Sequence, residues 1–266
     1  MTVSELASVP LALVRPDSTF SKTDVFRFPK VFLVLVLFLL YVLGLRLAAG
    51  FDENPHAKEL AVIEVDARLG SLMANAPPEA QKRARDQALS QILGDQGGIV
   101  SAISIVISAL LFLALAVELW LLSAIVTQFF GGQEERHGRE RPSLSLFLIA
   151  FLPLAIRKLL QGIILIFRNP EIAANALTLT EYRTVSAVRF DLFSFLPPLG
   201  LPVFFSTLLR LATDPFLIWT LGIIALGGRE VYRVSMKSAA GQSAVLLLIL
   251  CLQFTLFSRI GISMEL

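Results

Sequence analysis

The stretch 211-LATDPFLIWTLGIIALGGREVYRVSMKSAA-240 predicts a membrane-spanning helix with a basic flank. Asp214 is expected to cap this helix, because its carboxylate can accept a hydrogen bond from a free backbone N–H group of the first turn. Pro215 follows at the first helical position, where a missing N–H group costs nothing. Residues 215–228 carry no charge, and Trp219 lies near the start of this run, where an indole ring favours the membrane interface. A span that begins at Asp214 is therefore predicted.

The far end of this span is basic. Gly227 and Gly228 end the apolar run, and Arg229, Arg233 and Lys237 follow it. Because short cytoplasmic segments carry an excess of Lys and Arg, this end is predicted to be cytoplasmic. Two interpretations of the three basic residues remain open: a solvated flank, or a cytoplasmic contact face for anionic lipid or a protein partner.

The composition of the whole chain indicates a membrane protein. Hydrophobic residues make up 55% of the 266 residues and charged residues 17%, against about 25% charged in soluble domains. Several apolar runs are long enough to cross a bilayer as helices. The net charge of +2 does not favour nucleic acid as a partner, and the single Cys251 excludes an internal disulfide. The predicted fold class is an all-α, polytopic transmembrane bundle.

Five spans are predicted, and an odd number places the two termini on opposite sides of the membrane. The predicted spans are 31–49, 99–130, 144–167, 214–231 and 241–258. The second would be about 48 Å long as a helix, so it exceeds a hydrocarbon core of about 30 Å and must tilt or project. Pro153 lies inside the third span and should kink it.

The distribution of basic residues predicts the orientation. The cytoplasmic segments 1–30, 131–143 and 229–240 hold ten Lys and Arg in 55 residues, whereas the outer segments 50–98 and 168–213 hold nine in 95. This bias predicts a cytoplasmic N-terminus. The N-terminal arm 1–30 is interpreted either as an amphipathic segment on the cytoplasmic leaflet or as a partly ordered tail.

Both outer segments have features of their own. Residues 50–98 contain Pro77-Pro78, with a strong helix pattern at Glu79–Leu93 and a weaker one before the prolines. This outer helical segment is either a hairpin that docks a partner or a solvated connector. Residues 192–209 are uncharged but carry three prolines, which disfavour a spanning helix because lipid cannot replace the lost hydrogen bonds. They are interpreted as a membrane dip followed by an interfacial helix at 202–211, with a sixth span as the alternative.

Two charges lie deep inside predicted spans. Glu118 lies 12 residues before the cytoplasmic end of the second span, and Arg157 lies 13 residues after the cytoplasmic start of the third. Both are then about 18–20 Å deep, on helices that a short loop makes neighbours. An unpaired charge at that depth is costly, so we expect the two to form an intramembrane ion pair. The pair is either a salt bridge that fixes helix register or a polar site for a headgroup, ion or water; separate snorkelling to the interfaces is the alternative.

The opening stretch also resembles a known family. The pattern Asp214-x-Phe216-x-x-Trp219, an apolar run to Gly227 and Ser235-x-Lys237-x-Ala239 are similar to the penultimate transmembrane helix of the prokaryotic branch of the Yip1 family. Two further features agree with that family: Gly131-Gly132 at the end of a long span, and Leu152-Pro153 followed by Arg157 inside the next.

The resemblance covers about residues 99–257, with a looser match before them. It implies an integral membrane protein with five spans, in a bacterial plasma membrane, and it supplies no catalytic residue. Eukaryotic relatives act in vesicle trafficking, whereas the prokaryotic roles are poorly defined.

The sequence contains no motif of a zinc protease, a serine hydrolase elbow or a phosphate-binding loop. We therefore expect a non-enzymatic protein without a cofactor or metal. The leading hypothesis is a protein that organises the membrane or recruits other membrane proteins, with the lipid bilayer and a membrane-protein partner or a second copy as its contacts. The alternative is a small transporter or lipid-moving channel that uses the Glu118/Arg157 site and Pro153 as a hinge.

Overall fold

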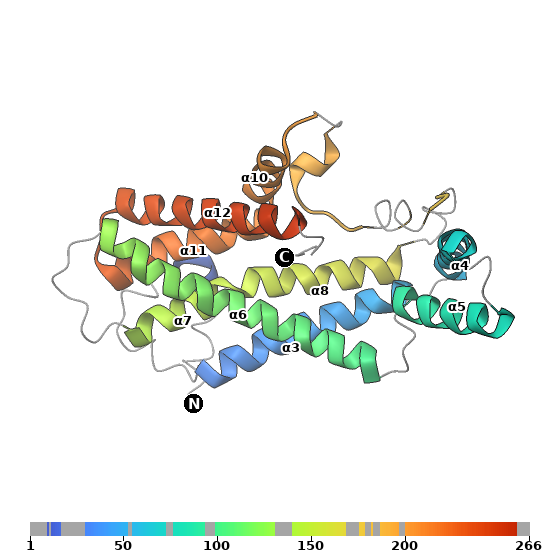
Figure 1. Cartoon of the computed structure of the whole chain (residues 1–266). Coiled ribbons are helices and arrows are strands. Elements are labelled where there is room, and N and C mark those ends of the chain that lie inside the picture. Colours follow the sequence, from blue (N-terminus) through green and yellow to red (C-terminus); the bar gives the residue numbers. More distant parts are fainter. Residues whose placement is uncertain are drawn as a thin grey trace. The chain divides into compact units, whose positions relative to one another are not determined.

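Helices make up all of the regular secondary structure in the part of the chain that the structure describes (Figure 1). The structure, a computed structural model, describes residues 10, 12–16, 30–52, 55–72, 77–93, 99–130, 140–168, 176–178, 182, 187–196 and 200–259. The regular elements are α3 (Lys30–Asp52), α4 (Pro55–Leu72), α5 (Pro78–Leu93), α6 (Ile99–Phe130), α7 (Glu140–Ala150), α8 (Leu152–Phe167), η3 (Leu192–Phe195), α10 (Val203–Thr213), α11 (Pro215–Tyr232) and α12 (Met236–Arg259). The predicted all-α fold class is confirmed.

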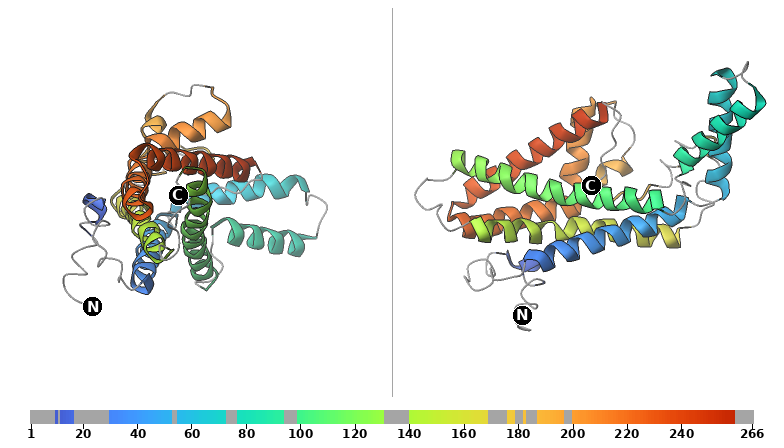
Figure 2. Two further views of the ribbon diagram at one scale, coloured as in Figure 1. Left: turned by 90° about the vertical axis from the view of Figure 1, so that its left-hand side faces the viewer. Right: turned by 60° about the horizontal axis from the view of Figure 1, so that its bottom comes forward.

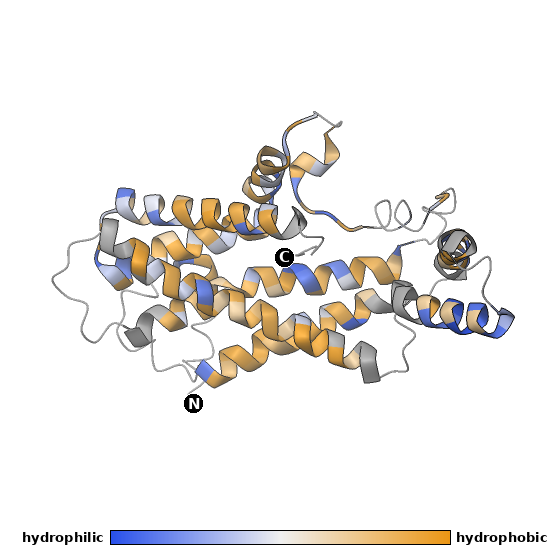
Figure 3. Ribbon diagram, in the orientation of Figure 1, coloured by the Kyte–Doolittle hydropathy of each residue, from blue (hydrophilic) through white to orange (hydrophobic). Residues whose placement is uncertain are grey.

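Within the described residues, four helical segments are long and apolar enough to cross a membrane by themselves. They are Lys30–Ala48, Ile105–Ser123, Leu144–Phe167 and Met236–Leu256. A fifth crossing requires α10 and α11 taken together, and the axes of these two helices are bent by 72°. Apolar residues cover most of α3, α6 and α12, whereas α5 is largely hydrophilic (Figure 3). The chain is therefore a polytopic helical membrane protein.

The chain divides into two compact units. The first comprises residues 1–40, 110–157 and 190–266, and the second comprises 41–109 and 158–189. In the first unit α11 packs against α7 and α12, and α10 packs against α12 and η3 (Figure 2). Helix α7 runs into α8 through a fully buried stretch, 145–152, which places α7 at the core of this unit.

Within the first unit, α6 has one buried and one exposed apolar stripe. Phe112, Leu115 and Leu119 are buried at helical spacing, whereas Leu111 and Leu121 are more than half exposed. Such a helix in a membrane protein buries the first stripe against protein and presents the second to lipid. The ring of Phe112 meets that of Phe151 edge to face, with the centroids 5.6 Å apart.

The third predicted span is interrupted where its proline requires it. Helix α7 ends at Ala150 and α8 begins at Leu152. Helical hydrogen bonds still cross the break, from Phe151 N to Phe147 O at 3.0 Å and from Ala155 N to Phe151 O at 3.1 Å. Pro153 has no N–H group to donate to the preceding turn, which accounts for the break at this point.

In the second unit, α3 and α8 approach each other through glycine. A Cβ atom at Gly44 would lie 2.5 Å from the carbonyl oxygen of Lys158, and one at Gly162 would lie 2.5 Å from the carbonyl oxygen of Gly44. Small residues permit this backbone contact between membrane helices. In the same unit α4 packs against α5, and the exposed pair Arg85–Asp66 joins them with Nε 2.7 Å from Oδ1.

The proline-rich region 192–213 holds short elements in its described part. Helix η3 has four residues and α10 has 11, which is about 16 Å of helix rise. The interfacial helix expected at 202–211 corresponds to α10. The sixth-span alternative finds no support, because α10 is too short to cross a bilayer unless it is combined with α11.

Some predictions fall on residues outside the described part. The cytoplasmic loop predicted at 131–143 is described only from residue 140, and the arm 1–30 only at residues 10, 12–16 and 30. Gly131-Gly132, Pro197 and Pro198 also lie outside the described residues.

Candidate functional site

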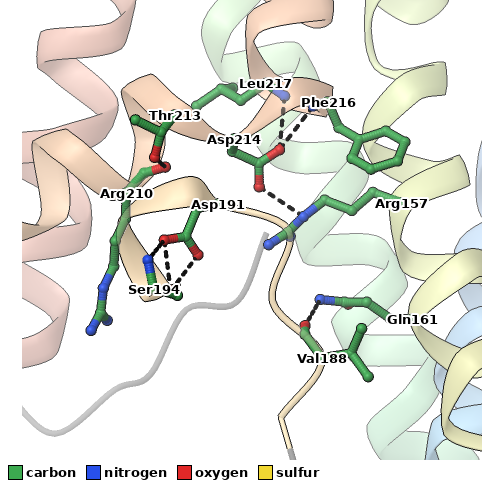
Figure 4. Close-up of polar contacts among 10 residues, drawn as sticks. All are labelled: Arg157, Gln161, Val188, Asp191, Ser194, Arg210, Thr213, Asp214, Phe216 and Leu217. Atoms are coloured by element: carbon green, nitrogen blue, oxygen red, sulfur yellow. Dashed lines mark hydrogen bonds and ion pairs between the residues drawn. The ribbon is translucent and has the colours of Figure 1, made fainter. Parts of the chain in front are cut away.

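Asp214 is the single residue between α10 and α11, and it starts the second helix. Its Oδ1 atom accepts hydrogen bonds from the backbone N–H groups of Phe216 at 2.9 Å and Leu217 at 3.2 Å (Figure 4). Pro215 occupies the first turn, as the sequence predicts. The backbone N–H of Asp214 donates to Leu211 O at 3.4 Å and closes α10. One residue therefore ends one helix and caps the next.

The second carboxylate oxygen of Asp214 forms an ion pair with Arg157 of α8. Arg157 Nε lies 2.9 Å from Asp214 Oδ2, and the two side chains are only 12% and 8% exposed. Burial of either charge alone would be costly, so each stabilises the other. The N-terminus of α11 adds a favourable field for the carboxylate.

A pair of contacting aromatic rings lies beside Arg157. The guanidinium carbon of Arg157 lies 5.9 Å from the centroid of the Phe190 ring. The rings of Phe190 and Phe216 meet edge to face, with the centroids 5.1 Å apart at 70°. Phe216 belongs to the predicted motif helix and thus has a direct structural role. The sequence does not point to Phe190, since nothing local distinguishes it from Phe193 and Phe195, which follow it closely.

Glu118 has a different partner from the one expected. Gln253 of α12 donates a hydrogen bond from Nε2 to Glu118 Oε1 of α6. The sequence predicts a Glu118–Arg157 pair, whereas the contacts described for these residues are those of Glu118 with Gln253 and of Arg157 with Asp214. Residue counting fixes the depth of a charge along its helix; it does not fix which neighbouring helix the charge faces.

Trp219 contacts the N-terminal segment. Its indole Nε1–H donates to the carbonyl oxygen of Leu13 at 2.8 Å. Residues 12–14 are helical, and Ala12 is fully buried. The sequence predicts Trp219 at the membrane interface and carries no local sign of this contact. An indole N–H in an apolar environment needs an acceptor, and the carbonyl of a short helix supplies one.

The three predicted contact residues Arg229, Arg233 and Lys237 are all exposed around the turn between α11 and α12. Arg233 ends α11 in the left-handed conformation, with φ 50°. Ser235 caps α12, because its Oγ accepts from Ser238 N at 3.1 Å. The turn is therefore built to reverse the chain while exposing basic side chains.

Further polar contacts hold the segment between α8 and α10. In the second unit, Gln161 Nε2 donates to Val188 O at 3.0 Å. In the first unit, the buried carboxylate of Asp191 accepts from the backbone N–H and hydroxyl of Ser194 and thereby caps η3. Arg210, which could have paired with Asp214, is exposed on α10 and points away from it (Figure 4).

The geometry supports a structural use of these charges. No cluster of three or more His, Cys, Asp or Glu that could hold a metal occurs among the described residues. Both oxygens of Asp214 are engaged, and Glu118 accepts from an amide. The polar groups at this site therefore fix helices relative to one another within the first unit.

The fold and site define a polytopic α-helical membrane protein with a charge-paired, broken helix. Residues 11–257 match the Yip1 domain, and the chain belongs to the Yip1 family. The match begins well before residue 99, so it includes the N-terminal contact of Leu13 and the first span. Comparisons with curated proteins and with solved structures gave no match.

Proposed function

We propose that this protein has a non-enzymatic role in its membrane and recruits or steadies other membrane proteins through the α11–α12 turn. The observation that supports the proposal is the exposure of three basic side chains around one turn. Arg229, Arg233 and Lys237 are all exposed, and Arg229 Nε also lies 3.5 Å from Glu230 Oε1. Asp214 and Arg157, in contrast, form a largely buried pair. Basic side chains next to a membrane favour anionic lipid or an acidic partner surface.

Crosslinking inside intact membranes tests this proposal. The tagged protein is crosslinked, purified and analysed by quantitative mass spectrometry, and the triple variant Arg229→Gln/Arg233→Gln/Lys237→Gln is compared with the wild type. We expect one dominant membrane-protein partner, or a second copy of the chain, that is lost in the triple variant. Recovery of lipid alone from the wild type would contradict the proposal.

A matched control distinguishes the effect of removing basic residues from the α11–α12 turn from the effect of lowering the net charge. Lys82, Arg83 and Arg189 are exposed away from this turn, and their replacement by Gln removes the same number of positive charges elsewhere. We expect this control to retain the partner. Equal loss in both triple variants would mean that total charge, and not the α11–α12 turn, governs the association.

A second candidate function, transport of a polar molecule or lipid, is favoured by one observation. Helices α10 and α11 form a broken pair, and an ionisable residue lies at the break. Broken helices in transporters present such groups to substrates. For this function Asp214 would have to exchange Arg157 for a substrate during each cycle.

Charge variants in reconstituted vesicles distinguish the two candidates. The exchange Glu118→Arg/Arg157→Glu tests whether those two residues depend on each other. Because their described partners are Gln253 and Asp214, we expect the exchange to be no more stable than either single change. Glu118→Gln should be well tolerated, since an amide oxygen also accepts from Gln253. Lipid scrambling or solute flux that falls in Glu118→Gln while the protein stays folded would favour transport.

A further inference from the structure

Helices η3 and α10 expose several large apolar side chains. Leu192 and Phe195 of η3 are 68% and 76% exposed. In α10, Val203 and Phe205 are each more than half exposed, and Leu209 is also exposed. Exposure of such an apolar surface to water is unfavourable. In a membrane protein, surfaces of this kind normally face lipid.

The side chains of α10 divide into three faces. Phe204 and Leu211 belong to the face that packs on α12, where Cys251 Sγ donates to the carbonyl oxygen of Phe204 at 3.5 Å. Phe205 and Leu209, four residues apart, form an exposed apolar face. A third face is polar, with Ser206, Arg210 and Thr213 at helical spacing. This division is typical of a helix that lies at the boundary between headgroups and acyl chains.

The bend at Asp214 sets the direction of α10. Its axis makes an angle of 72° with that of α11, so α10 runs across the direction of α11 and does not extend it. The ion pair Arg157–Asp214 and the cap on α11 fix the residue at the bend. Phe193 N donates to Thr213 Oγ1 at 3.3 Å, which ties η3 to the end of α10.

We infer that η3 and α10 form a wedge that lies in the leaflet at the Pro215 end of α11 and inserts Phe195, Phe205 and Leu209 among lipid acyl chains. The occupant of this apolar surface is thus the bilayer itself. The surface adjoins lipid-facing protein, because α12 exposes Leu252 and Leu256 directly after Cys251. Arg210 on the polar face is suited to a phosphate headgroup.

An inserted wedge has a physical consequence. It adds apolar volume to the outer part of one leaflet only, so it binds best where lipids are loosely packed or the leaflet is convex. The inference goes beyond the proposed recruiting role and does not depend on it: it gives the molecule a preference for curved membrane that needs no protein partner.

Depth measurements test the insertion. Single-cysteine variants at Phe205, Leu209, Ser206 and Arg210 are prepared in a Cys251→Ser background, spin-labelled and reconstituted in phosphatidylcholine and phosphatidylglycerol vesicles. Labels at 205 and 209 should be more accessible to oxygen, which concentrates in the acyl region, and those at 206 and 210 to an aqueous nickel chelate. Preferential nickel access at 205 and 209 would overturn the inference. Protection from both reagents there would also overturn it, since a protein surface would then cover the face.

A sorting measurement tests the consequence. Wild-type protein, equilibrated between small and large vesicles by slow detergent removal, should be enriched in the small ones. The variant Phe195→Ser/Phe205→Ser/Leu209→Ser should lose this enrichment, whereas Phe195→Leu/Phe205→Leu/Leu209→Ile should keep it. Circular dichroism establishes that each variant is folded, and equal sorting of the Ser variant and the wild type would overturn the wedge.

The two proposals fail separately. The vesicle experiments use purified protein without partners and leave the α11–α12 turn intact. If the wild type crosslinks to a partner but sorts no differently from the Ser variant, the wedge is wrong and the recruiting role stands. If no partner is found but the wild type is enriched in small vesicles and the Ser variant is not, the protein acts on lipid alone.

Discussion

At the scale of single residues, Asp214 uses each carboxylate oxygen for a different purpose. Oδ1 caps α11 through two backbone N–H groups, and Oδ2 faces Arg157. The cap and the ion pair are separable by substitution, because Asn retains a capping oxygen but carries no charge.

We predict that Asp214→Ala destabilises the protein more than Asp214→Asn. Asn should lose only the ion pair, which leaves Arg157 buried without its counter-charge and costs about 3–5 kcal/mol. Ala should lose the cap as well, at about 1 kcal/mol more. Unfolding of the purified protein in mixed micelles by SDS, followed by circular dichroism, measures both effects.

A double variant serves as the control for this prediction. Arg157→Met/Asp214→Asn removes both charges and keeps the cap, so it should recover much of the stability that Asp214→Asn loses. If the double variant were as unstable as the sum of the two single changes, the two side chains would not be coupled in the folded protein.

At the scale of elements, close helix contact depends on glycine at two positions. Gly44 and Gly162 lie where α3 and α8 meet, and a methyl group at either would enter the backbone of the other helix. In contrast, a Cβ atom at Gly222 of α11 meets nothing within 4 Å. The substitution Gly222→Ala can therefore serve as the control for Gly44→Ala and Gly162→Ala.

We predict that Gly44→Ala and Gly162→Ala destabilise the folded protein, because a backbone contact cannot yield as a flexible side chain would. Gly222→Ala should be neutral or stabilise the protein by about 0.5–1 kcal/mol, since Ala favours the helix. The midpoint of thermal unfolding in detergent compares the three variants. Equal midpoints would show that α3 and α8 do not approach through these glycines.

A second element-scale prediction concerns the N-terminal segment on α11. Trp219→Phe removes the hydrogen bond to Leu13 O but keeps an aromatic ring, so it should weaken docking by about 1 kcal/mol. An N-terminal epitope tag should then be removed faster by a protease that cuts at Arg15. Trp120→Phe, which leaves that bond intact, should leave the cleavage rate unchanged. An unchanged rate in Trp219→Phe would mean that the contact does not hold the segment.

At the scale of the whole molecule, the orientation in the membrane stays a prediction. The bias of basic residues places the N-terminus and the α11–α12 turn in the cytoplasm, and the segment 50–98 outside. In the Cys251→Ser background, Lys82→Cys should react with an impermeant maleimide added to intact bacterial cells. Ser235→Cys should react only after lysis. Reaction of both in intact cells would show that the two sites share a side, and the span count between them would then be even.

The sequence by itself determined the class of molecule and most of its helices. Long apolar runs exclude a water-soluble fold, because lipid is the only solvent that such surfaces favour. Asp214-Pro215 predicted the start of α11, since capping and a proline in the first turn are local effects. Pro153 predicted the break between α7 and α8 for the same reason. The motif around Asp214, Phe216 and Trp219 indicated the Yip1 family, to which the chain belongs.

The tertiary structure alone decided which polar groups meet. Arg157 pairs with Asp214, and Glu118 accepts from Gln253, because each helix turns a particular face to its neighbours. The contact of Trp219 with Leu13 joins residues 206 positions apart, and no local pattern reports such a distance. Sequence patterns fix depth and helix ends, which depend on nearby residues, whereas helix rotation and the choice of neighbour depend on packing across the whole unit.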